Sequence, residues 1–149
     1  MTGQAAERFV VVSLRLLAVT FAVVGLLFLC APDGTLSVLD DFGDWLPLGH
    51  FTPAPETTEQ LWLALGFAYM TVITLICVVV STDVVRYRPL LLVLAAGKVA
   101  SSLTALGFYL FDTDVFAYLL NFLVDGFLVG VALLVWALAG RVGDPAGAT

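Results

Sequence analysis

Two charged residues stand inside long apolar stretches of the sequence, and they are the residues best placed to do chemistry. Lys98 interrupts the apolar run 90–111, and Asp125 interrupts the run 115–139. A charge at the centre of a membrane is costly, so such residues normally pair with an opposite charge or take part in binding or proton transfer. A lysine and an aspartate in neighbouring runs therefore predict an ion pair in a water-poor interior.

The two charges fall at similar depths if both runs are helices. A rise of about 1.5 Å per residue places Lys98 roughly 20 Å from the end of its run at Phe111, and Asp125 roughly 15 Å from the start of its own run at Val115. The short connection makes the two helices antiparallel. The remaining offset of about 5 Å is within reach of a flexible lysine side chain. We therefore expect direct contact between the two charges where these helices face each other.

Further polar side chains share the helix faces of the two charges. Tyr118 and Asn121 follow the helical spacing of Asp125, and two serines follow Lys98 in the same way. Small and polar side chains allow close helix packing and hydrogen bonds between membrane helices. The candidate intramembrane site therefore consists of Lys98, Asp125, Asn121, Tyr118, Ser101 and Ser102. Because each charge has a partner, the simplest interpretation of the pair is structural, and a binding role stays open.

Other polar residues inside the apolar runs have simpler interpretations. Arg15, about two turns into its run, either extends to the lipid headgroups or adds a second cation to the cluster, which makes it a secondary candidate. The hydroxyls of Tyr69, Thr71 and Thr74 are expected to bond to the preceding turn of their own helix, and the alternative is a role in binding.

Four long apolar segments must position these residues. The chain has 149 residues, a mean hydropathy of +1.06 and only 12% charged residues, whereas a soluble domain has about 25%. A span needs about 20 apolar residues. The segments are 9–30, 61–80, 90–111 and 115–139, and the long loop is 31–58. The sequence thus predicts an all-α, polytopic membrane protein with one four-helix domain over residues 1–149.

The distribution of charge predicts how this domain is oriented. All arginines fall in the three regions on one side of the four spans: Arg8, Arg15, Arg86, Arg88 and Arg141. The regions on the other side hold eight acidic residues and neither lysine nor arginine. The positive-inside rule then places both termini in the cytoplasm of a multi-pass protein of the plasma or inner membrane. Nothing in the sequence is basic enough to suggest a nucleic-acid partner.

The loop 31–58 mixes acidic and apolar residues. A short helix lying along the membrane interface would expose the acids and bury Leu39, Phe42 and Trp45. The simpler interpretation is a clasp that closes the bundle. The alternative is a lid over a cavity that opens outward.

The sequence gives no sign of a cofactor or a metal. Cys30 lies near one face of the predicted membrane and Cys77 near the other, which excludes a disulfide between them, and both are expected to pack as buried thiols. The sequence lacks a pair of haem-ligating histidines and any flavin or metal motif. We therefore expect neither a metal nor a cofactor.

Several features of this layout are shared with a known membrane-protein family. They are Arg15 and Gly25 in the first segment, Ala31-Pro32-Asp33 at its end, Gly97-Lys98 with Ser101-Ser102 in the third, and Asp125 in the fourth. On these features most of the chain resembles the small four-helix proteins grouped as DoxX-like. The resemblance implies an association with membrane oxidoreductase complexes, often as an accessory subunit.

Three classes of function follow from these observations. The first is an accessory or scaffolding subunit, whose partners besides the lipid bilayer are other membrane subunits or a second copy of the chain. The second is a binding or transport protein for a small lipophilic or protonatable molecule, which uses the mid-membrane polar cluster as its pocket. The third is an enzyme with Lys98 as base and Asp125 as acid, although no nucleophile or metal constellation accompanies them.

Overall fold

The fold is all-α. The computed structural model describes residues 3–47, 50–58 and 60–142, and these contain five helices and no strand beyond an isolated bridge between Thr52 and Val115. The helices are α1 (Gly3–Cys30), α2 (Pro32–Trp45), α3 (Gln60–Thr82), α4 (Leu90–Phe111) and α5 (Phe116–Val142).

Four of the five helices, namely α1, α3, α4 and α5, are long and apolar enough to cross a membrane. The all-α prediction and the four apolar helices are therefore confirmed. Three helices exceed the predicted segments, since α1 begins at Gly3, α3 covers Gln60–Thr82 and α5 ends at Val142. Residues 143–149 lie outside the described residues. So does Glu59, one of the eight acidic residues counted for the charge distribution.

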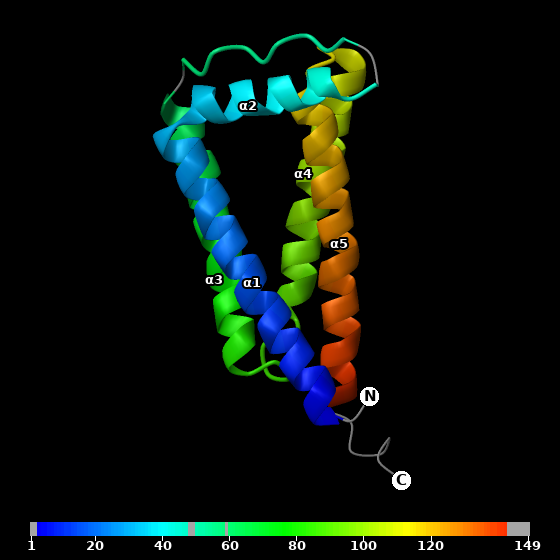
Figure 1. The fold of residues 1–149 in the computed structure, drawn as a ribbon. Coiled ribbons are helices and arrows are strands. Elements are labelled where there is room, and N and C mark those ends of the chain that lie inside the picture. The colour runs from blue at the N-terminus through cyan, green and yellow to red at the C-terminus, as the bar shows by residue number, and fades with distance from the viewer. Residues whose placement is uncertain (1–2, 48–49, 59, 143–149) are drawn as a thin grey trace.

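The four long helices form two pairs that spread apart toward one end. α1 packs mainly on α3, and α4 packs mainly on α5. The pairs meet at the end where α1 begins and α5 ends, and they separate toward the other end, where α2 lies across the gap (Figure 1). We call these the narrow end and the α2 end. A short turn between Phe111 and Phe116 connects α4 to α5. The connection from α1 to α3 is longer and contains α2.

The hydrophobic core fills the half of the bundle near the narrow end. It includes Leu14, Cys77, Leu91 and Val135, which come from the four long helices and are almost completely buried. Alanines among the core residues of α1, α4 and α5 allow the helices to approach closely. The tight packing of this half fixes the four helices relative to one another.

α2 is held across the α2 end by contacts at both of its ends. It follows α1 after a single residue, Ala31, and Pro32 occupies its first turn, where proline is favoured. At its other end, Gly43 is buried against Phe116 of α5. A 14-residue helix is about 21 Å long, enough to bridge the two pairs of helices.

The segment 50–58 after α2 runs back along the same helix, and we call it the returning segment (Figure 1). Hydrogen bonds from its backbone N–H groups to carboxylates of α2 hold it there. Asp40 accepts a hydrogen bond from the backbone N–H of Ala54 at 2.9 Å, and Asp33 accepts one from Thr57 at 2.8 Å. Thr52 bonds to Asp114 beside the start of α5 through its backbone and side chain. Two acids of α2 thus satisfy backbone donors of the returning segment.

The predicted short helix is present, and its apolar residues point in two directions. Phe42 and Trp45 are 47% and 76% exposed on the protein surface, whereas Leu39 faces the interior of the bundle. α2 packs on α5 through Gly43, and insertion of Phe42 and Trp45 into a membrane interface stays a prediction. Asp40, predicted to be exposed, is half-buried because it bonds to the returning segment.

Candidate functional site

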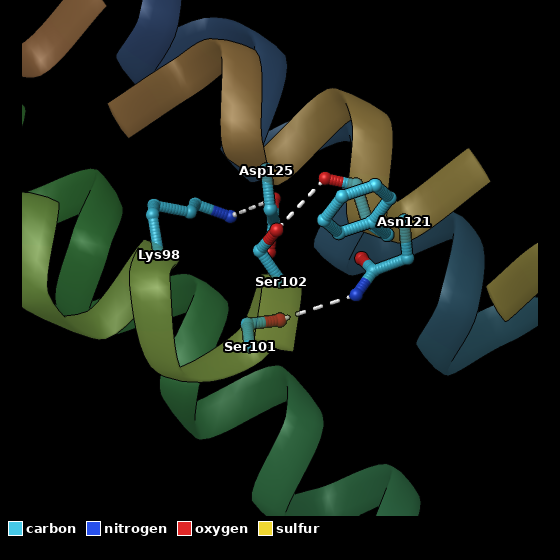
Figure 2. Close-up of polar contacts among 6 residues, drawn as sticks. Lys98, Ser101, Ser102, Asn121 and Asp125 are labelled. Atoms are coloured by element: carbon cyan, nitrogen blue, oxygen red, sulfur yellow. Dashed lines mark hydrogen bonds and ion pairs between the residues drawn. The ribbon is translucent and has the colours of Figure 1, made fainter. Parts of the chain in front are cut away.

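The two mid-segment charges form a buried ion pair between α4 and α5. Lys98 Nζ donates a hydrogen bond to Asp125 Oδ1 at 2.8 Å, and the two side chains are only 3% and 5% exposed (Figure 2). The ion pair predicted from the depth of the two residues is therefore present. Of the residues that the structure describes, no other two form a salt bridge.

Two further hydrogen bonds join α4 to α5 beside the ion pair. Ser102 Oγ donates to the backbone carbonyl of Phe122 at 2.8 Å, and Asn121 Nδ2 donates to Ser101 Oγ at 3.3 Å (Figure 2). A Cβ placed on Gly126 would lie 3.4 Å from Ser102 Oγ, so the helices touch closely here. Five of the six candidate residues thus form one polar seam.

The remaining candidates lie elsewhere. Tyr118 lines the cavity described below. Its ring packs at a tilt against that of Phe108, with the ring centroids 5.6 Å apart. Arg15 is exposed on α1, neither lines that cavity nor pairs with the cluster, and therefore adds no second cation to it. The prediction of two buried thiols is wrong for Cys30, which is exposed where α1 ends, while Cys77 is buried in the core.

The ion pair lies at the floor of a large cavity between the spread halves of the bundle. The cavity has a volume of about 920 Å³, and all five helices contribute to its lining. Leu36 and Leu39 of α2 form its roof, and Lys98 and Asp125 are the only charged residues in its lining among those that the structure describes. Pockets for small molecules have volumes of about 300–1,000 Å³ and mostly apolar walls with a few polar groups. This cavity fits that description.

Two aromatic residues from the opposite pair of helices complete the surroundings of Lys98. Its Nζ lies 4.8 Å from the ring centroid of Phe21 in α1 and 5.6 Å from that of Tyr69 in α3. Both distances are within the range of cation–π attraction. The ammonium therefore faces a carboxylate on α5 and aromatic rings on α1 and α3, so all four long helices meet at this point.

The hydroxyl of Tyr69 differs from the other hydroxyls of α3. Thr71 and Thr74 bond to carbonyls of the preceding turn at 2.9 and 2.7 Å, as expected. Tyr69 Oη is buried and has no hydrogen-bond partner among the described residues, so the expectation fails for this residue. Its rigid ring carries the hydroxyl away from its own backbone and toward Gly97, where a Cβ would lie 3.3 Å from the oxygen.

Sequence reasoning missed Phe21 and Tyr69 as neighbours of the ion pair. Phe21 lies on α1, far from α4 in sequence, whereas Tyr69 lies on α3, which directly precedes α4. An aromatic ring in an apolar run carries no signal of its partner. The signal that could have indicated Tyr69 is its polar hydroxyl at the middle of a span, together with Gly97 beside Lys98.

The site combines a neutral ion pair, an unpartnered phenolic hydroxyl and a large apolar chamber. No group of three or more histidine, cysteine, aspartate or glutamate side chains that could hold a metal occurs within the described part of the chain. The arrangement is suited to hold an apolar molecule and to hydrogen-bond one polar group at the cavity floor.

No protein-family model, curated protein or solved structure matches the chain. The resemblance to DoxX-like proteins therefore stays a prediction, and the function must be argued from the geometry.

Proposed function

We propose that this integral membrane protein binds a small lipophilic molecule in the cavity between α2 and the ion pair. The observation that carries the proposal is the cavity itself, about 920 Å³ of mostly apolar space with a polar floor. A chain selected only to pack tightly would close such a space, because each void sacrifices packing contacts. Here, α2 and the returning segment instead hold the two pairs of helices apart.

The walls of the cavity support access from the side. Thr20 of α1, Thr104 of α4 and Asn121 of α5 line the cavity and are exposed rather than buried. Because these residues belong to the membrane-spanning helices, the space between them opens toward the hydrocarbon interior. A lipophilic molecule dissolved in the bilayer can then enter without crossing water.

The charge distribution supports an orientation with the α2 end outside the cell and both termini in the cytoplasm of a plasma or inner membrane. The region between α3 and α4 carries Arg86 and Arg88, whereas the segment of α2 and its return is acidic. In a cysteine-free background, Ser37→Cys is expected to react with an impermeant maleimide on intact cells. Arg86→Cys should react only after permeabilisation. The reverse pattern would invert the orientation.

A bulky side chain at Ala100 tests the binding function. Ala100 lines the cavity and is exposed, so Ala100→Phe fills space without displacing the buried core. We expect the affinity for the neutral fluorophore aminoanthracene, measured in lipid nanodiscs against empty nanodiscs, to fall by about tenfold or more.

The matched control is Ala96→Phe, one helical turn away on α4, exposed but outside the cavity lining. It should leave the affinity unchanged. Equal binding by the wild type and both variants would place the fluorophore outside the cavity and reject the proposed function.

An accessory or scaffolding subunit is the second candidate function. It is favoured by Gly66 and Gly130, which are exposed on α3 and α5 with open space where a Cβ would be. Exposed glycines on membrane helices allow close contact with another helix, from a second copy or from another subunit. If aminoanthracene does not bind and a defined membrane protein copurifies in mild detergent, this function replaces the first.

A further inference from the structure

We infer that the ligand is a neutral lipophilic molecule whose polar group is a carbonyl oxygen, held at the cavity floor by the hydroxyl of Tyr69 beside Lys98. The inference rests on the proposed function and specifies the class of molecule that the cavity takes. It follows from the charges, the hydrogen-bond donors and the shape of the cavity.

The charges of the lining favour a neutral ligand. Within the described part of the chain, Lys98 and Asp125 are the only charged residues of the lining, and their side chains pair at 2.8 Å. An anionic or cationic ligand would either compete for one member of this pair or bring an unpaired charge into an apolar space. Both cost much free energy where water is excluded. A neutral polar group avoids both costs.

The polar groups near the floor favour an acceptor on the ligand. Tyr69 Oη is buried without a partner, and a phenol is a good hydrogen-bond donor. The ammonium of Lys98, which lies 5.6 Å from the same ring, carries three N–H groups and can only donate. One of these groups is directed to Asp125. A carbonyl oxygen accepts from either donor and carries no proton that would need a partner of its own.

The shape of the cavity favours a ligand with its polar group at one end. From the floor at Lys98, the cavity extends past Val24 and Phe108 to the roof at Leu36. These walls are mostly apolar, with Thr35, Thr104 and Tyr118 among them, whereas the charged pair and the unpartnered hydroxyl of Tyr69 lie at the floor. The carbonyl therefore lies beside Tyr69, and the apolar body of the ligand extends toward α2.

Competition among three molecules of equal carbon number tests this class. Methyl decyl ketone, dodecane and dodecanoate compete with aminoanthracene for the wild-type protein in lipid nanodiscs. We expect the ketone to compete at a concentration about tenfold lower than either of the others. In Tyr69→Phe, the ketone should compete less well, at a concentration closer to that of dodecane, while the competition by dodecane itself is unchanged. The control is Tyr118→Phe, a second tyrosine of the cavity lining, which should preserve the preference for the ketone.

The outcomes separate this inference from the proposed function. If aminoanthracene binds but dodecane or dodecanoate competes as well as the ketone, the ligand class is wrong and the cavity still binds lipophilic molecules. If aminoanthracene itself does not bind, both are wrong. Should Tyr69→Phe fail to fold, the infrared carbonyl band of the ketone bound to wild type decides. A shift to lower frequency than in dodecane supports the hydrogen bond, and an unshifted band overturns it.

Discussion

Asp125→Leu is expected to destabilise the protein by about 3 kcal/mol or more, the largest effect of any single substitution considered. The change removes the carboxylate that lies 2.8 Å from Lys98 Nζ and leaves a buried ammonium without its counter-charge. Breaking a buried pair in this way is strongly destabilising, typically by about 3–5 kcal/mol. The free energy of unfolding can be measured by titration of detergent-solubilised protein with a denaturing detergent.

Two comparisons make this prediction specific. In the double variant Lys98→Met/Asp125→Leu, both charges are replaced by apolar side chains of similar size, and stability should return to within about 1 kcal/mol of the wild type, since such replacements are often neutral. Asp41→Leu, an exposed acid of α2, should have little effect. Asp125→Leu with wild-type stability would contradict the burial of the pair.

The double variant also separates a structural role of the pair from a role in binding. If the pair only fixes α4 against α5, the double variant folds and binds the ketone like the wild type. If the ammonium assists Tyr69 in holding the carbonyl, the double variant folds but prefers the ketone less. The simplest interpretation of the sequence, a purely structural pair, is thereby open to direct test.

The ion pair could be predicted from the sequence because every step of the argument is local. Lys98 and Asp125 lie on consecutive helices joined by a short turn, so their depths follow from residue counts alone. The seam of Ser101, Ser102 and Asn121 follows from the same helical spacing. Hydropathy identifies the four long helices for a similar reason, since it depends only on neighbouring residues.

The cavity and its aromatic lining could not be predicted in this way. A leucine that faces lipid and one that faces an internal cavity have the same hydropathy. The separation of the two helix pairs therefore cannot be recognised from the composition. The ring of Tyr69 lies 5.6 Å from Lys98 Nζ because of the way α3 packs beside α4, and the hydropathy of the two helices does not encode which faces meet. The short helix α2 was predicted, but its contacts were not, since its acids could face solvent or the returning segment.

Gly43→Ala is expected to weaken the attachment of α2 to α5 by about 1–3 kcal/mol, the range typical of overpacking. A Cβ at this position would lie 2.7 Å from Cγ and 2.9 Å from Cβ of Phe116, a residue that is itself buried and has little room to move. Gly34→Ala in the same helix is the matched control, because its Cβ would meet only Ala31 Cβ at 4.0 Å. By helix propensity alone, both changes should stabilise α2.

Hydrogen exchange at the amides of α2 distinguishes the steric effect from the propensity effect. Exchange should accelerate in Gly43→Ala and slow or stay unchanged in Gly34→Ala. Equal protection in the two variants would mean that α2 does not depend on its contact with Phe116.

The same pair of variants distinguishes a lid from a clasp. Leu36 and Leu39 form the roof of the cavity, so a looser α2 exposes the ligand to the α2 end of the bundle. If α2 is a lid, Gly43→Ala increases both the association and dissociation rates of aminoanthracene and changes its affinity little. If α2 only clasps the helices together, the ligand exchanges through the side walls at the wild-type rate, and the substitution affects stability alone.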